Sequence, residues 1–416
     1  MCGHLGRVVE QLKEKLRRYR RAGTVTQMQI ARNERRFAAA GSEHPLAPHA
    51  VGEVCGQISD LLGPGPAPDV VFVFCSGDQV ASAEATLRAV DALLSPRICV
   101  GAASTGTLAG AREVEGRSSL SVWAARLGEA VEPVSFDLTS TDAGVVVAGT
   151  SELVDATGHL VVVGDPQGLP ITGLLTSLAQ RAPELKVLGG LAPPVGSRAL
   201  PLLLEGTAVR TGGMVGVRLA ESVPMTTLVA QGCRPVGDPM AVTGTDGTML
   251  TGLAGRKPMD RIRELAQRMD PDDRELASGG LHLGVVVDEH RLEFGHGDFV
   301  IRSVMGADVG SGALAMGEPL PLGTTVQFQV RDPTVAEADL AGLAELAGRA
   351  EAALVFVCSR RGVGFFGEPH HDASQLADTT GASAIAGMFC AGEIGPIGGV
   401  TRVHSLSAAV ALFRDG

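Results

Sequence analysis

The sequence is poor in aromatic residues and in positive charge. Aromatic side chains make up only 3% of the 416 residues, with one Trp and one Tyr. Stacking of nucleic-acid bases on aromatic side chains is therefore excluded as a main mode of recognition. The formal net charge is −11, which argues against a surface that binds nucleic acid or an anionic membrane. We expect no nucleic-acid partner.

Paired cysteines and long hydrophobic runs are also missing. The seven cysteines include no CxxC pair, which is typical of reduced thiols rather than of a disulfide framework or a zinc site. No apolar run approaches the roughly 18 residues that a membrane helix needs. The charged N-terminus lacks the apolar core of a signal peptide. These absences predict a cytoplasmic protein without a membrane span.

The familiar catalytic motifs are absent as well. The sequence contains no P-loop, G-x-S-x-G, H-E-x-x-H or EF-hand pattern. Residues 362–367 match G-x-G-x-x-G, but residues 368–372 follow where a dinucleotide site needs a helix. The adjacent His370 and His371 have no third ligand at a suitable spacing. We predict neither catalysis nor a metal site.

The first 45 residues differ from the rest in charge. They hold ten Lys and Arg against four acids, and their apolar residues recur at helical spacing. We interpret residues 1–45 as a basic helical extension that need not belong to the fold. Two alternatives stay open. The segment could be an amphipathic helix for a membrane or a partner, or Met28 could be the true start, so that residues 1–27 are not native.

The remaining chain predicts a mixed α/β protein of two domains, 46–220 and 221–416. A pattern of strand, helix, strand, glycine-rich loop and strand occurs three times, which indicates an internal repeat. The strands that suggest it are 70–75, 98–101 and 118–124, then 160–164, 187–192 and 214–219, then 353–358, 384–387 and 405–410. A β-rich insert is expected at about 221–335.

Local signals place several boundaries. Gly63–Pro64 should end a helix that begins near Ala47. Asp246–Gly247 lies between two apolar runs, which predicts a hairpin. Asp332–Pro333 has the residues of a helix N-terminus, because Asp caps the free N–H groups and Pro suits the first turn.

The stretch 384–399 is the strongest candidate for a functional site. It begins as an apolar strand and continues as a glycine-rich loop whose only charge is Glu393. Arg360 follows the neighbouring strand, where open α/β sheets bind ligands. An arginine can hold a carboxylate and a glutamate can accept from an ammonium, so the two would suit a zwitterion. Equally, they could simply pair with each other.

Several segments resemble the FIST family of sensory domains over about residues 30–416. In the second half these are 389–399 (FCAGEIGPIGG) followed by His404, then 297–302 (GDFVIR) running into 305–308 (MGAD), and 231–237 (QGCRPVG). In the first half they are 74–77 (FCSG), 101–106 (GAASTG) and 189–192 (GGLA). The family loop often carries an acid after Ser-Thr-x-Gly, whereas Gly106–Thr107 directly follow Ser104–Thr105 here.

The resemblance implies a sensor of small ligands in signal transduction, with amino acids as suggested ligands. We expect its output to pass through a separate protein. The residues that we expect to contact the ligand lie on the glycine-rich loops and the strand ends: Ser104, Thr105, Gly189, Gly190, Arg360, Gly392, Glu393 and His404.

Three alternative functions remain open at this point. Some members of the family resemble haem-based gas sensors, and His404 or His371 would then be the axial ligand. An enzyme could use Cys390 and Glu393, with His404 as a base, on a small metabolite. The protein could also be a scaffold without a ligand.

Overall fold

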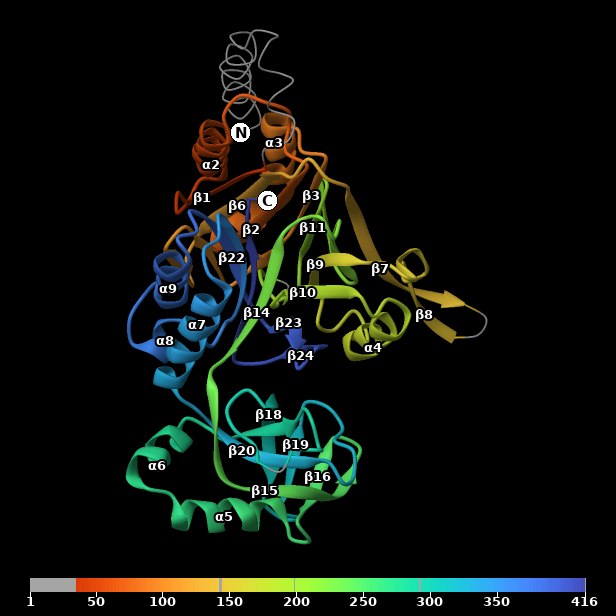
Figure 1. Ribbon diagram of the computed structural model, residues 1–416, viewed down its shortest axis with the longest axis vertical. Coiled ribbons are helices and arrows are strands. Elements are labelled where there is room, and N and C mark those ends of the chain that lie inside the picture. The colour runs from red at the N-terminus through yellow and green to blue at the C-terminus, as the bar shows by residue number, and fades with distance from the viewer. Residues whose placement is uncertain (1–34, 142–143, 198, 292, 416) are drawn as a thin grey trace.

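The structure, a computed structural model, describes residues 35–141, 144–197, 199–291 and 293–415. These residues form three mixed sheets and a closed barrel. Figure 1 shows the barrel at one end of the molecule, with helices α2 and α3 at the other. The α/β class is as expected. None of the helices formed by the described residues is long and apolar enough to span a bilayer.

The first sheet has the strand order β1-β6-β2-β3-β11-β12. Two helices and a 3₁₀ segment accompany it. The bounds are β1 (Arg36–Ser42), α2 (Ala47–Leu62), β2 (Val70–Ser76), η1 (Gly77–Ser82), α3 (Ala83–Leu94), β3 (Ile98–Ser104), β6 (Ser119–Arg126), β11 (Leu203–Glu205) and β12 (Ala208–Arg210).

The second sheet has the order β24-β23-β10-β9-β13-β7-β8. Its bounds are β7 (Val131–Thr141), β8 (Gly144–Ala148), η2 (Ser151–Leu153), β9 (Gly158–Gly164), α4 (Ile171–Arg181), β10 (Leu185–Leu191), β13 (Met214–Leu219), β23 (Gly392–Ile397) and β24 (Val400–His404).

The third sheet has the order β14-β25-β21-β22-β4-β5. Its bounds are β4 (Gly106–Ala109), β5 (Arg112–Glu115), β14 (Met225–Gln231), α7 (Pro333–Ala347), β21 (Ala352–Cys358), α8 (Val363–Phe366), α9 (His371–Thr380), β22 (Ala384–Cys390) and β25 (Ser407–Phe413).

The barrel corresponds to the β-rich insert. Its strand order is β15-β16-β19-β18-β17-β20. The bounds are β15 (Cys233–Asp246), β16 (Met249–Leu253), α5 (Pro258–Arg268), α6 (Pro271–Ser278), β17 (His282–Val286), β18 (Phe299–Asp308), β19 (Ala313–Met316) and β20 (Thr325–Arg331). The hairpin predicted at Asp246–Gly247 is present: Asp246 ends β15 and pairs with Met249 of β16, and Gly247–Thr248 form the turn. The Asp332 side chain caps α7 by accepting from the amides of Thr334 and Val335.

The inner faces of the three sheets share one apolar core. Alternate residues of β2 divide between two clusters: Phe72 and Phe74 face the shared core, whereas Val71 and Val73 face α2 and α3. The aromatic rings of Trp123 on β6 and Phe413 on β25 lie 5.0 Å apart in that core. Strands buried on both faces explain the continuous apolar runs in the sequence.

Each sheet takes its last two strands from another part of the chain. The β4–β5 hairpin leaves the first sheet and pairs with β22 of the third. The β23–β24 hairpin leaves the third sheet and pairs with β10 of the second. The β11–β12 hairpin follows the second sheet and pairs with β3 of the first. The three sheets are thus joined in a closed ring of exchanged hairpins.

This exchange corrects two of our expectations. The glycine-rich loops expected after the strands 98–101 and 384–387 are instead strands for most of their length, because only Thr105 separates β3 from β4 and only Ala391 separates β22 from β23. Gly189 and Gly190 likewise lie inside β10 rather than in a loop. The glycines were read as turn residues, whereas they allow strands to approach closely.

The structure also bears on the two expected boundaries, near residues 45 and 220. β1 pairs with β6 along its whole length, so the fold begins inside the segment 1–45 that was interpreted as an extension. The helix expected near the N-terminus lies outside the described residues. The domain division near residue 220 stays a prediction, and strands from both sides of it share the second and third sheets.

Three glycines occupy the same place in the three sheets. Gly101, Gly189 and Gly387 pair with a valine on the neighbouring parallel strand. A Cβ atom on these glycines would lie 1.8, 1.9 and 2.0 Å from the carbonyl oxygen of that valine. No side chain fits at such a distance, so glycine is required at each position for steric reasons.

We expect Gly387→Ala to destabilise the protein, because its new methyl group would push β21 and β22 apart. Overpacking of this kind costs typically about 1–3 kcal/mol. Urea unfolding of the purified protein measures the loss. Gly173→Ala is the matched control, since nothing lies within 4 Å of a Cβ placed there and alanine favours the helix. Equal stability of the two variants would contradict the steric argument.

Candidate functional site

Glu393 is buried in the centre of the molecule. It lies on β23 opposite Gly190 of β10, with 0% of its surface exposed. Its Oε2 atom accepts from the backbone amide of Ser407 at 3.2 Å and from the Ser407 hydroxyl at 2.7 Å. Its Oε1 atom has no hydrogen-bond partner among the described residues. A buried carboxyl with one free oxygen is costly, so we expect it to be neutral near neutral pH.

The electrostatics of Glu393 agree with that expectation. Burial raises the pKa of the Glu393 carboxyl to about 8, and the hydrogen bonds from Ser407 and the charge of Arg361 oppose the rise only in part. Arg361 is itself engaged elsewhere, because its guanidinium binds both carboxylate oxygens of Asp372 at 2.8 and 2.9 Å. The pair is fully buried. Glu393 is therefore left without a counter-ion of its own.

Of the two adjacent arginines, Arg361 rather than Arg360 lies in the interior near Glu393. The side chain of Arg360 is exposed, and none of the ion pairs among the described residues joins it to Glu393. Arg361 is 1% exposed, and its Nη1 atom has no partner among the described residues. The sequence marked only that two arginines follow a strand. It could not show which of them turns inward, because Asp372 comes from the following helix.

The other predicted ligand residues divide into two groups. Gly189, Gly190, Gly392 and His404 lie with Glu393 on the adjacent strands β10, β23 and β24. Ser104 and Thr105 lie at the junction of β3 and β4. The hydroxyl of Ser104 is buried and donates to the carbonyl of Phe389 at 2.6 Å, whereas Thr105 is exposed. Apart from Thr105, these residues are buried and not accessible to solvent.

Covalent catalysis by Cys390 receives no support from its surroundings. Burial raises the pKa of the Cys390 thiol well above its usual value, which opposes the reactive thiolate. His404 lies opposite Glu393, but its Nε2 atom interacts with the carbonyl of Gly395 at 2.8 Å. Burial lowers the pKa of His404 to about 4. His404 is thus a neutral interior histidine rather than a base beside a nucleophile.

Both candidates for an axial haem ligand make contacts within the fold, although Nδ1 of His404 has no hydrogen-bond partner among the described residues. His404 holds the Gly395 carbonyl as described. The ring of His371 stacks on Phe366 with 3.6 Å between centroids, and its Nδ1 atom lies 3.4 Å from Asp372. Within the part of the chain that the structure describes, no group of three His, Cys, Asp or Glu side chains could hold a metal ion.

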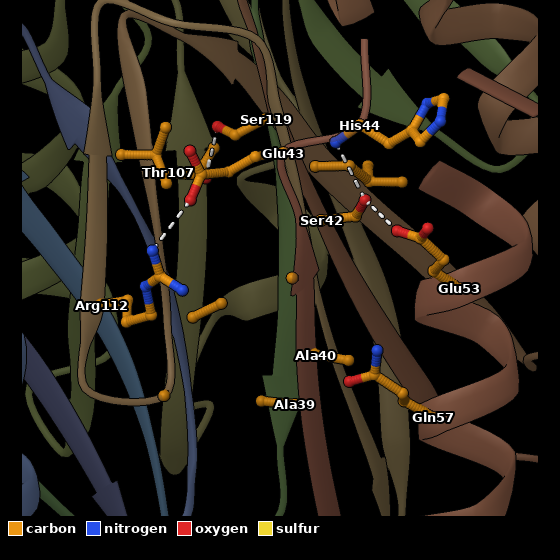
Figure 2. A pocket seen from close by; sticks show the side chains of 15 residues that line it. Ala39, Ala40, Ser42, Glu43, His44, Glu53, Gln57, Thr107, Arg112 and Ser119 are labelled. Atoms are coloured by element: carbon orange, nitrogen blue, oxygen red, sulfur yellow. Dashed lines mark hydrogen bonds and ion pairs between the residues drawn. The ribbon is translucent and has the colours of Figure 1, made fainter. Parts of the chain in front are cut away.

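An open groove lies on the first half of the molecule instead. It has a volume of about 570 Å³ and runs between β1, helix α2 and the β4–β5 hairpin. Figure 2 shows Arg112 of the hairpin on one wall and Glu53 and Gln57 of α2 on the opposite wall. The volume falls in the range of about 300–1,000 Å³ that is usual for small-molecule sites.

Charges of both signs line this groove. Glu43 forms ion pairs with Arg112 at 3.2 Å and with Arg117 at 2.9 Å. On the helix side, the carboxylate of Glu53 accepts from the Ser42 hydroxyl at 2.5 Å. Thr107 and Ser119 also line the groove, but both are buried and their hydroxyls bond to each other at 2.7 Å, so the exposed polar groups are mainly those of the charged residues and Gln57. Such a surface offers donors and acceptors to one small polar ligand.

Sequence reasoning missed this groove. One wall is β1, which lies in the segment that was interpreted as an extension. Another is the hairpin that was interpreted as a loop, and only Ser104–Thr105 beside it were selected. The residues 36–42 (RFAAAGS) carry no apolar/polar alternation of their own, and the alternating burial of Ala38, Ala40 and Ser42 appears only in the structure. That alternation is typical of a half-buried strand.

The fold and its sites define an α/β protein whose two halves share their sheets, with a β-barrel set into the second half. Within that class, the chain belongs to the FIST family. The model of the FIST N domain matches residues 69–256, and that of the FIST C domain matches residues 259–396. FIST domains are sensory domains in signal transduction.

Mycobacterial relatives extend over almost the whole chain. The uncharacterized protein Rv0628c of Mycobacterium tuberculosis (strain ATCC 25618 / H37Rv) is 38% identical over 389 residues, which are 91% of this chain and 100% of the relative. The uncharacterized protein Mb0898c of Mycobacterium bovis is 39% identical over 378 residues, which are 89% of this chain and 97% of the relative. Similarity of this extent covers both halves and the barrel.

The buried carboxyl of Glu393 leads to a prediction about pH. Its folded-state pKa of about 8 lies above the ordinary value of 4.5, so the neutral form stabilises the fold at low pH. This stability is lost as the pH rises through about 8. We expect Glu393→Gln, which mimics the neutral carboxyl, to reduce the loss of unfolding free energy between about pH 5 and pH 8.5 by about 2–4 kcal/mol.

Urea unfolding at a series of pH values measures this difference. Glu345→Gln on the exposed side of α7 is the control, and its pH profile should match that of the wild type. If Glu393→Gln and the wild type lose stability in parallel, the carboxyl is already charged in the folded protein.

Proposed function

We propose that this protein is a cytoplasmic sensor module of signal transduction that binds a small zwitterion, such as an amino acid, without catalysing a reaction. The observation that carries the proposal is the open groove between β1, α2 and the β4–β5 hairpin, with charges of both signs on its walls. Membership of a family of sensory domains supports it. The signal then passes to a separate output protein.

A zwitterion suits the groove because the two charges of the ligand find partners on opposite walls. Arg112, on the hairpin, is exposed and can share its guanidinium between Glu43 and a ligand carboxylate. Glu53, on α2, is exposed and accepts from Ser42 through one oxygen, which leaves acceptor capacity for an ammonium group. The Gln57 amide beside it adds a donor and an acceptor.

In this proposal the buried residues around Glu393 do not contact the ligand but correspond, in another sheet, to the residues of the groove. We infer that the three sheets are copies of one unit, and the strand registers support this inference. Val122 pairs with Val73 and Val410 pairs with Val355, which makes Ser119 and Ser407 equivalent. Their partners are Thr107 in the groove and Glu393 in the interior, at 2.7 Å in both cases. The Thr107–Ser119 pair beneath the groove and the Glu393–Ser407 pair in the interior are thus equivalent, and all four residues are buried.

A thermal-shift screen against amino acids and related amines and carboxylates tests the proposal. A ligand at about 100 times its Kd should add roughly 2.7 kcal/mol of stability. Glu53→Gln and Arg112→Gln should each weaken binding of the responding ligand about tenfold or more, because a hydrogen bond to a charged group contributes about 1.5–3 kcal/mol.

Asp60→Asn is the matched control, since Asp60 is exposed on the same helix but lies outside the groove. It should bind the ligand as the wild type does. A flat response across the panel, in protein shown to be folded, would refute the proposal. A ligand whose affinity is unchanged in both groove variants would place its site elsewhere.

A further inference from the structure

The β4–β5 hairpin has two functional faces. Along β5, Arg112 and Val114 line the groove, whereas Glu113 and Glu115 point to the second half of the chain. Strand side chains alternate between faces, so one strand contacts both regions. On β4, Thr107 lines the groove and the neighbouring Leu108 is buried in the core beneath α7 and α9.

The carboxyl groups on the far face hold backbone amides of two helices. The Oε1 atom of Glu113 accepts from the amide of Ala373, in the first turn of α9, at 2.9 Å. The Oε1 atom of Glu115 accepts from the amide of Val363, the first residue of α8, also at 2.9 Å. These are the free N–H groups that a helix leaves at its N-terminus.

Two further contacts fix the same junction. The backbone amide of Glu113 donates to Nδ1 of His370 at 3.0 Å, and the Ser374 hydroxyl donates to the carbonyl of Ala111 at 3.1 Å. Space is tight as well. A Cβ atom on Gly362 would lie 1.8 Å from the Glu115 carboxylate. A shift of β5 would therefore strain or break the four hydrogen bonds that join the hairpin to the starts of α8 and α9.

The segment 360–374, which the hairpin contacts through Glu113 and Glu115, includes part of the protein surface. Arg361 and Asp372, which form the buried ion pair, lie within residues 360–374. Between them the chain returns to solvent, where Val363 and Glu368 are exposed, and Arg360 just before them is exposed as well. Movement at the hairpin can thus change the surface at 360–370 while the ion pair anchors its two ends.

We propose that the β4–β5 hairpin transmits the state of the groove to the segment 360–374, through the Glu113 and Glu115 contacts with α9 and α8. An occupant of the groove draws the Arg112 guanidinium, which it shares with Glu43, towards itself and shifts β5. The helix amides held on the other face are then released, and the altered surface at 360–370 is what an output protein reads. The physiological occupant rests on the proposed function, whereas the coupling itself does not.

A covalent occupant tests the coupling without a known ligand. Gln57→Cys, in a full-length chain that also carries Cys2→Ser, places one thiol in the groove. The six described native cysteines are buried, so N-phenylmaleimide should label position 57 selectively. Hydrogen exchange at the amides of Val363 and Ala373 is the readout. We expect labelling to accelerate exchange at both amides at least about fivefold, as loss of their acceptors frees them to exchange.

Two controls separate coupling from general destabilisation. Asp60→Cys, labelled in the same way on the same helix outside the groove, should leave both amides unchanged. Glu115→Ala should raise exchange at Val363 before labelling, and labelling at position 57 should then add little at that amide.

The coupling is wrong if the label at position 57 leaves Val363 and Ala373 unchanged, or if the label at position 60 has the same effect. The two proposals fail separately. A positive exchange result with a flat amino-acid screen would refute the zwitterion and keep the coupling. A responding amino acid together with unchanged exchange would refute the coupling alone.

Discussion

The close approach of parallel strands at three Val–Gly pairs is the constraint on which the rest of the structure depends. In each pair the glycine has no Cβ atom, and a Cβ atom at that position would collide with the carbonyl oxygen of the valine on the neighbouring strand. On its other side the same glycine pairs with an aliphatic residue of an exchanged hairpin: Leu204, Ile394 or Leu108. The three sheets can then pack on one apolar core while the helices cover their outer faces.

This arrangement explains why polar side chains are found in so apolar an interior. Where a strand leaves one sheet and enters the next, its neighbours cannot all be supplied by regular ladders. Ser104 meets the carbonyl of Phe389 at one junction, and Ser407 meets Glu393 near another. Buried polar groups are stable only when they are hydrogen-bonded or neutral. Glu393 is stable in the interior because its raised pKa keeps its carboxyl group neutral.

Local signals in the sequence were sufficient for elements whose ends are set by nearby residues. The glycine after Leu62 ends α2, Asp332 caps α7, and Asp246–Gly247 turn the first barrel hairpin. The chain between Gly101 and Gly110 was misread because its partner, β22, lies more than 270 residues away in the sequence. Glycine has the same local meaning in a turn and in a crowded strand, and only the partner strand distinguishes the two.

The candidate site also depends on contacts between segments that are distant in the sequence. Glu393 was recognisable as the only charge in a glycine-rich stretch, but its burial depends on β10 and Ser407. The choice between Arg360 and Arg361 depended on Asp372. The groove needed β1, α2 and the hairpin together. Residue types were therefore predictable from the sequence, whereas accessibility came only from contacts between distant segments.

The ring of exchanged hairpins has a consequence for the two family domains. They meet at about residues 256–259 in the sequence, yet the first lends β4–β5 to the third sheet and the second lends β23–β24 to the second sheet. A chain cut at that point would yield two fragments with bare strand edges, and such edges recruit other strands. The two domains follow each other in the sequence, but their strands share the second and third sheets, so each completes the other's strand edges.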